Sequence, residues 1–81
     1  MLALSGNSLG DDGAKALAGS PKLTSLSTLD LSANGIGDAG AKALAASPHL
    51  KGLTKLEMFA NDLSDTGKTT LSKRFGGVVK L

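Results

Sequence analysis

The chain has 81 residues, a net charge of +2 with dispersed lysines, two phenylalanines as its only aromatic residues, and no cysteine. This length allows one domain with a thin core, and the absence of cysteine excludes a disulfide framework and thiol-ligated zinc. Without a transmembrane stretch, a signal peptide or a basic cluster interleaved with aromatics, the sequence predicts a cytoplasmic protein that binds neither membranes nor nucleic acid.

The predicted elements follow one another as strand, turn and short helix. Residues 2–4 alternate between apolar and small side chains, as a half-buried strand requires, and a helical pattern follows over residues 11–18. The second copy is the clearest, with a strand at Leu29-Asp-Leu31, a turn through Asn34-Gly35 and a helix from Asp38. A third copy begins at Leu56, so the chain is predicted to contain the same unit three times.

The units repeat with a period of 27 residues. When residues 2–28 are aligned with residues 29–55, more than half of the positions are identical. Such self-similarity predicts a solenoid in which stacked neighbours bury one another's leucines. We expect a single domain over residues 1–81, with repeats at about 2–28, 29–55 and 56–81.

The start of each predicted helix carries an aspartate, namely Asp11, Asp38 and Asp65. We predict that each caps its own helix, because an aspartate oxygen can accept from the free amides of the first turn. The small residues that follow, such as Gly40 and Ala41, are expected to let the helix lie close to the sheet. Pro21 and Pro48 are expected to stop the first two helices.

The segment LTSLSTLDLSANGI at residues 23–36 resembles the leucine-rich-repeat signature L-x-x-L-x-L-x-x-N-x-L, and residues 53–63 match it again. The following GDAGAKALA is similar to the helical half of ribonuclease-inhibitor-like repeats. The resemblance implies an α/β solenoid, a horseshoe fragment with a parallel sheet on its concave face and short helices on its convex face. It also implies the C-terminal portion of a bacterial-type solenoid that acts as a non-catalytic scaffold, holds a protein partner of unknown identity and needs no cofactor.

Two sets of residues acquire roles through this resemblance. In such folds an inward-turned asparagine satisfies backbone groups at the strand exit, which implies a structural ladder of Asn7, Asn34 and Asn61. The side chains that alternate with the core leucines would line the concave face. They form the predicted partner-binding set: Thr28, Asp30, Ser32, Lys55, Glu57 and Phe59. Phe59 stands where the other units have serine, so it is either an exposed anchor for a partner or a cover for the C-terminal end.

The two ends of the chain differ. Residues 75–81, FGGVVKL, take the place of another leucine motif and predict a C-terminal cap in which Val78, Val79 and Leu81 lie over the open end of the core. The first strand has no such device, so three readings stay open: the tail of a longer solenoid, a homo-oligomer formed through this uncapped edge, or a first unit that frays. A purely structural capping or self-assembly unit without a ligand is therefore the alternative function.

Candidate chemistry is sparse. Gly67-Lys68-Thr69 resembles the end of a phosphate-binding loop, which makes nucleotide binding a remote alternative, but Asp62 stands where the first glycine of that loop is required. A carboxylate there would repel phosphate. The only histidine, His49, cannot by itself form a catalytic triad or a multi-histidine metal site. We expect no catalytic residue, no metal site and no enzymatic activity.

Overall fold

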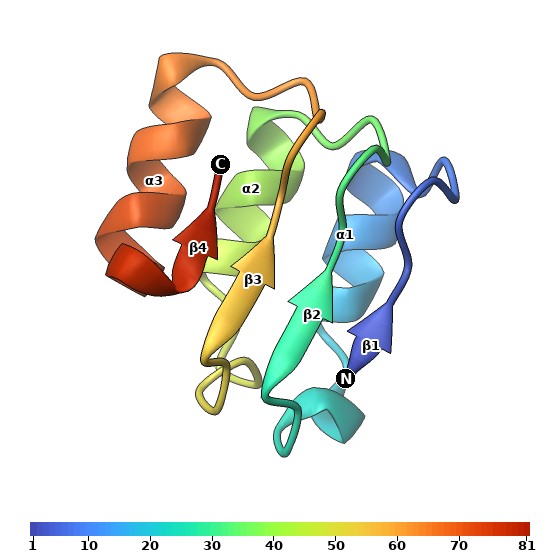
Figure 1. Cartoon of the computed structure of the whole chain (residues 1–81), viewed down its shortest axis with the longest axis vertical. Coiled ribbons are helices and arrows are strands. Elements are labelled where there is room, and N and C mark those ends of the chain that lie inside the picture. Colours follow the sequence, from blue (N-terminus) through green and yellow to red (C-terminus); the bar gives the residue numbers. More distant parts are fainter.

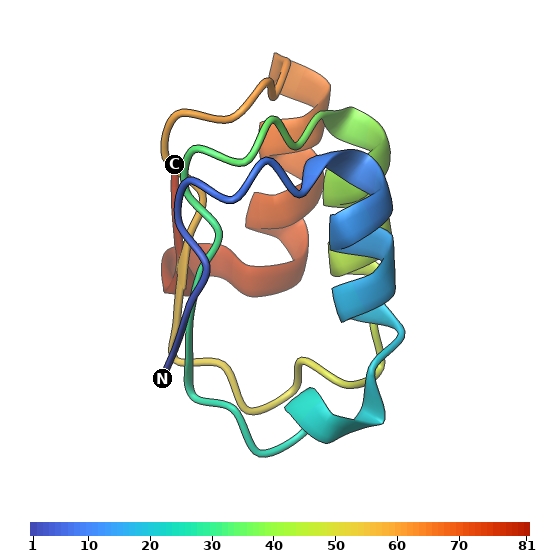
Figure 2. The ribbon, with the colours of Figure 1, turned by 90° about the vertical axis from the view of Figure 1, so that its right-hand side faces the viewer.

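The computed structural model describes all 81 residues as two layers, a parallel sheet and a row of helices. The strands are β1 (Leu2–Ala3), β2 (Thr28–Asp30), β3 (Lys55–Glu57) and β4 (Val79–Lys80), paired in that order. The α-helices are α1 (Gly10–Ala18), α2 (Asp38–Ala45) and α3 (Asp65–Phe75), with short 3-10 turns at η1 (Pro21–Leu23) and η2 (Gly76–Val78). All three α-helices lie on one side of the sheet, and the other side is uncovered (Figures 1 and 2).

The sheet aligns equivalent positions of successive units. Leu2 pairs with Leu29, and Leu29 pairs with Leu56, in parallel register. Because side chains alternate along a strand, these leucines all point to the helix layer. The predicted α/β architecture with a parallel sheet is confirmed, although the sheet has four strands where three were expected.

The core lies between the two layers. Leu29, Leu31, Ile36 and Leu44 of the second unit have no exposed surface. Burial of one such side chain contributes about 1.5–3 kcal/mol. Their counterparts in the first unit are only partly buried because no unit covers them on that side: Leu2, Leu4, Leu9 and Leu17. Burial of a leucine therefore depends on the unit beside it.

Small residues set the spacing between neighbouring helices. A Cβ atom placed on Gly40 of α2 would lie only 3.0 Å from the Cβ of Ala14 in α1 and 2.7 Å from Ile36 Cγ2. Ala14 and Ala41 are fully buried. The sequence interpretation assigned these residues to the contact between helix and sheet, whereas Gly40 and Ala14 meet between α1 and α2.

The expectation that each aspartate caps its own helix is wrong. Asp11, Asp38 and Asp65 lie inside the first turns, and none of the three helices has a side-chain cap of its own. Asp11 Oδ1 instead accepts hydrogen bonds from the amides of Gly37, at 2.7 Å, and Gly40, at 2.9 Å, at the start of α2. Asp38 Oδ1 likewise accepts from the amide of Ser64 at the start of α3, at 2.9 Å. These two aspartates therefore satisfy free amides of the next helix and none of their own.

The C-terminal segment agrees with its prediction in part. Val78 and Val79 pack against the core, as a cap requires, but the segment forms a fourth parallel strand in which Val79 and Lys80 pair with Leu56 and Glu57. Val79 points inward and is buried, while Leu81 is 40% exposed. Only the three residues of η2 separate α3 from β4, so this segment adds a strand to the sheet without a further turn and helix.

The strand-to-helix turns use left-handed backbone conformations. Gly6, Ala33 and Ala60 occupy equivalent positions and have φ angles of 74°, 58° and 57°. Glycine adopts this region without strain, whereas alanine pays a steric cost.

None of the helices has the length and apolar character that crossing a bilayer requires.

Candidate functional site

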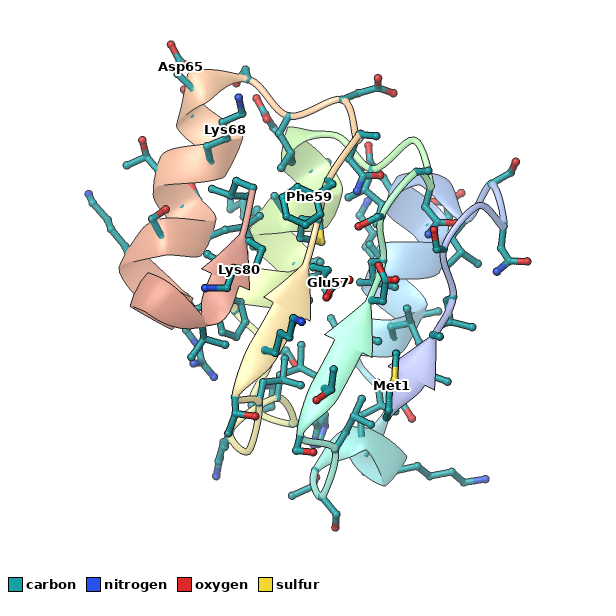
Figure 3. The ribbon with its side chains drawn as sticks, viewed as in Figure 1. Met1, Glu57, Phe59, Asp65, Lys68 and Lys80 are labelled. Atoms are coloured by element: carbon teal, nitrogen blue, oxygen red, sulfur yellow. The ribbon has the colours of Figure 1, made fainter.

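The uncovered side of the sheet carries all six of the predicted partner-binding residues. We call this surface the open face and define it by side chains that alternate with the inward leucines: Thr28, Asp30, Ser32, Lys55, Glu57, Phe59 and Lys80. Figure 3 looks onto this surface and shows Glu57, Phe59 and Lys80 on the side of the sheet opposite the helices. All seven are exposed or partly exposed.

A row of side chains crosses the middle of the open face. The register places Ala3 beside Asp30, Asp30 beside Glu57, and Glu57 beside Lys80. Two carboxylates on neighbouring strands would repel each other if no cation lay near them. Here Lys55 and Lys80 flank Glu57, so the β3 and β4 side carries both signs of charge, and the β1 and β2 side carries Asp30 alone.

One ion pair organises the centre of this face. Lys55 Nζ lies 2.9 Å from Glu57 Oε1. The hydrogen bond to Glu57, the charge of Glu57 and then the charge of Asp30 raise the pKa of Lys55 above its ordinary value of 10.5. An exposed pair of this kind contributes little to stability, but it places opposite charges side by side on β3 at the centre of the open face.

Phe59 follows β3 at the edge of the open face. Its side chain is 49% exposed, in contrast to its neighbour Met58, which is buried in the core. Its backbone amide donates to Ser32 Oγ at 3.0 Å, and Ser32 N donates to Asp30 Oδ1 at 3.0 Å. These two hydrogen bonds hold the backbone that follows β2 and β3 in place. Phe59 therefore exposes half of its surface from an ordered position.

The three predicted ladder asparagines lie in the turns next to this face. Asn34 is 1% exposed, and its Oδ1 accepts from the amides of Asn7, at 2.8 Å, and Leu9, at 3.3 Å. Its Nδ2 donates to three carbonyls, those of Leu4, Leu31 and Ser32. Every polar group of this side chain is used within the protein.

The other two asparagines make the same kinds of bonds, with differences at the ends. Asn61 Oδ1 accepts from Asn34 N and Ile36 N, at 2.9 and 3.0 Å, so each turn is tied to the one before it. Asn7 Nδ2 donates to Leu4 O, at 2.7 Å, and Ser5 O, at 3.3 Å, but Asn7 is exposed. The bonds therefore become fewer toward the first unit.

The helix side of the molecule offers shallow grooves. A groove of about 460 Å³ between α2 and α3 is lined mainly by polar and small residues. Gly67 is buried within α3, where Asp38 of α2 lies against it and accepts from Ser64 N at 2.9 Å and from the Gly67 amide. A phosphate at Gly67 would have to displace that carboxylate, so this position does not resemble a phosphate cradle.

The single histidine, for which no catalytic or metal-binding role was predicted, lies in a loop. His49 lies in the return loop after α2, and its backbone amide donates to Ser47 Oγ at 3.2 Å. No three histidine or carboxylate side chains gather closely enough to hold a metal ion.

Sequence reasoning missed Lys80 as a member of the open face. A signal was present, since Val79-Lys-Leu81 repeats the apolar, polar, apolar order of Leu29-Asp-Leu31 and Leu56-Glu-Met58. The shorter connection after α3 moves this strand out of the 27-residue period, and a search at fixed period passes over it. The spacing changed while the alternation remained.

Comparison with protein families agrees with the geometry. The family model described as "Leucine Rich repeat" matches residues 2–18 and 22–45, which together are just over half of the chain. No curated protein matches the chain. The matched residues supply β1, β2, α1, α2 and the turns with Asn7 and Asn34. The chain therefore belongs to the leucine-rich repeat family.

Proposed function

We propose that the chain is a non-catalytic interaction module that binds a protein partner through the open face. Leucine-rich repeats generally mediate protein–protein interaction. The proposal assigns this chain to the ribonuclease-inhibitor-like kind, as a single domain of three 27-residue repeats whose open face is the concave side of a horseshoe fragment. It also takes the chain to be a cytoplasmic scaffold without a cofactor.

The observation that carries the proposal is the exposure of Phe59 beside a fixed set of charges. An aromatic side chain that is 49% exposed lies on the same side of the sheet as the Lys55–Glu57 ion pair and Asp30. Aromatic anchors surrounded by polar groups are typical of the centres of binding interfaces. Phe59 adds nothing to the buried core, so its role as an anchor is favoured over its role as a cover.

The size of the open face limits how a partner binds. Four strands spaced about 4.8 Å apart measure about 14 Å across, and a typical specific interface covers about 800 Å² on each partner. A partner must therefore also contact the turns that follow the strands. Without such contacts, or further units beside this chain, binding is weak.

A paired-variant experiment tests this proposal. Wild-type chain, Glu57→Ala/Phe59→Ala, and a helix-side control, Thr69→Ala/Lys73→Ala, are used to capture proteins from an extract of the source organism. A partner of the open face binds the wild type and the control at equal levels and loses at least about tenfold in affinity with the open-face variant, as expected for loss of an aromatic anchor. Equal affinity of all three proteins for every captured partner overturns the proposal.

A second candidate function is self-assembly through the first unit. Leu2, Leu4 and Leu9 are partly exposed, while their counterparts in the second unit are fully buried. The outer edge of β1 is also unpaired, and such an edge can pair with another strand. Sedimentation of the wild type and a Leu9→Lys variant over a concentration range tests this function. Dimers that Leu9→Lys abolishes support self-assembly, whereas a wild-type monomer at all concentrations rejects it.

A further inference from the structure

The dipeptide Asn34–Gly35 combines a structural role with an intrinsically reactive sequence. An asparagine side chain can be attacked by the backbone nitrogen of the next residue, and glycine places no side chain in the way. Among the ladder asparagines, only Asn34 precedes glycine, because Asn7 precedes serine and Asn61 precedes aspartate. The most reactive sequence of the three is thus at the most buried of the three positions.

The folded protein holds this side chain in five hydrogen bonds. Asn34 Oδ1 accepts from Asn7 N and Leu9 N, at 2.8 and 3.3 Å. Asn34 Nδ2 donates to the carbonyl oxygens of Leu4, Leu31 and Ser32, at 2.9, 3.0 and 3.1 Å. Attack requires the side-chain carbon to swing onto the Gly35 nitrogen, which breaks these bonds. The fold therefore protects Asn34 by fixing its amide.

We propose that Asn34–Gly35 is a deamidation site that the fold keeps closed, that unfolding opens, and whose product cannot return to the native structure. In the open chain the Gly35 nitrogen loses its proton and bonds to Cγ of Asn34. The bond from Cγ to Nδ2 breaks, and ammonia leaves, which gives a cyclic succinimide. Water then opens the ring at either carbonyl and yields aspartate or isoaspartate at position 34.

The surroundings of Asn34 explain why neither aspartate nor isoaspartate at position 34 fits the native structure. Aspartate places an oxygen where Nδ2 donates to three carbonyl oxygens, so donors are replaced by a fourth acceptor at 2.9–3.1 Å. One carboxylate oxygen still accepts from the amides of Asn7 and Leu9, but the other faces only acceptors, and no cation lies beside it. An almost fully buried negative charge in such surroundings is strongly unfavourable. Isoaspartate also adds a backbone atom to a turn that is tied to both neighbouring units. Each unfolding event thus carries a risk of permanent loss.

The rates of reaction test the first part of the proposal. The full chain is incubated in mildly alkaline buffer with and without a denaturing concentration of guanidinium chloride, and peptide mass spectrometry follows each asparagine. In denaturant, Asn34 reacts fastest of the three ladder asparagines. In native buffer its rate falls at least about 100-fold, because only the opened fraction reacts. Equal rates in the two buffers, or an Asn61 that reacts as fast as Asn34 in denaturant, overturn the proposal.

Two sets of variants separate the chemistry from the fold. Gly35→Ala, measured only in denaturant, slows reaction at position 34 to the level of Asn61, and an unchanged rate contradicts the assignment. Asn34→Asp represents the product directly and is compared by circular dichroism with Asn7→Asp, whose exposed side chain tolerates a carboxylate. Asn34→Asp remains unfolded after dilution from denaturant while Asn7→Asp refolds. A native spectrum for Asn34→Asp overturns the claim that the product is excluded.

Discussion

Asp11 of α1 lies directly over Gly40 of α2, with Asp11 Oδ1 2.9 Å from the Gly40 amide nitrogen. A Cβ atom on Gly40 would approach the same oxygen to 2.7 Å and the Cβ of Ala14 to 3.0 Å. Asp38 and Gly67 repeat this arrangement one unit later. The pairing explains why a glycine lies inside α2 and inside α3, where it is ordinarily unfavourable.

Gly40→Ala is therefore expected to destabilise the protein by about 1–3 kcal/mol through overpacking, although alanine in a helix usually gains about 1 kcal/mol over glycine. Gly19→Ala is the matched control, because the nearest atom to its added Cβ is Lys15 O at an ordinary 3.6 Å. It should change stability by no more than about 0.5 kcal/mol or increase it slightly. Urea denaturation measures both, and an equally stable Gly40→Ala contradicts the close-approach explanation.

The interaction of Asp38 with α3 predicts a pH dependence. The Ser64 hydroxyl first, then the Ser64 and Gly67 amides, hold the pKa of Asp38 below its ordinary value of 3.8. A carboxyl whose folded pKa is lowered stabilises the protein above its unfolded pKa, and this contribution is lost as the pH falls through the lower folded value.

Unfolding measured between pH 6 and pH 2 should therefore show a steeper loss of stability for wild type than for Asp38→Asn, since a neutral amide gains and loses no charge. Asp65→Asn serves as the control, because the Asp65 carboxylate accepts no hydrogen bond from a neighbouring unit. It should follow the wild-type curve. Parallel curves for wild type and Asp38→Asn would show that the contact between α2 and α3 carries no such linkage.

The left-handed turns predict stabilising substitutions. Ala33 and Ala60 have φ angles of 58° and 57°, and the first unit has Gly6 at the same position. Replacing either alanine by glycine relieves a steric cost of about 1–2 kcal/mol against an entropic loss of about 0.4–1 kcal/mol. We expect a net gain of roughly 0.5–1 kcal/mol for each. Ala16→Gly, on the exposed side of α1, should instead lose about 1 kcal/mol, and thermal unfolding distinguishes the two signs.

The asparagines predict a gradient of stability along the chain. Asn34→Ala leaves the amides of Asn7 and Leu9 without their partner inside the protein, while the three carbonyls that Asn34 Nδ2 contacts each keep one other donor. At about 1–3 kcal/mol for each buried unsatisfied group, the loss should be about 2–6 kcal/mol, a large part of the stability of a small domain. Asn7→Ala affects exposed groups only and should cost about 1 kcal/mol or less. Similar losses for the two variants would show that burial does not control the contribution of these side chains.

The sequence by itself determined the repeated unit and the identity of the open face. The 27-residue spacing of Leu2, Leu29 and Leu56 was sufficient to predict parallel strands in register, because a unit with one apolar side must stack on a copy of itself. The alternation along each strand then placed Asp30 and Glu57 on the opposite side from the leucines. Period and alternation are local properties, so they can be read without coordinates.

Only the tertiary structure decided which unit each polar side chain serves. Asp11 could be recognised as a capping residue, but the sequence does not show that its carboxylate reaches the start of α2 and leaves its own helix uncapped. Likewise, Val79 and Lys80 form a fourth strand because a three-residue turn returns the chain to β3. Both outcomes depend on distances between units, and these distances are fixed by the packing of one helix on the next.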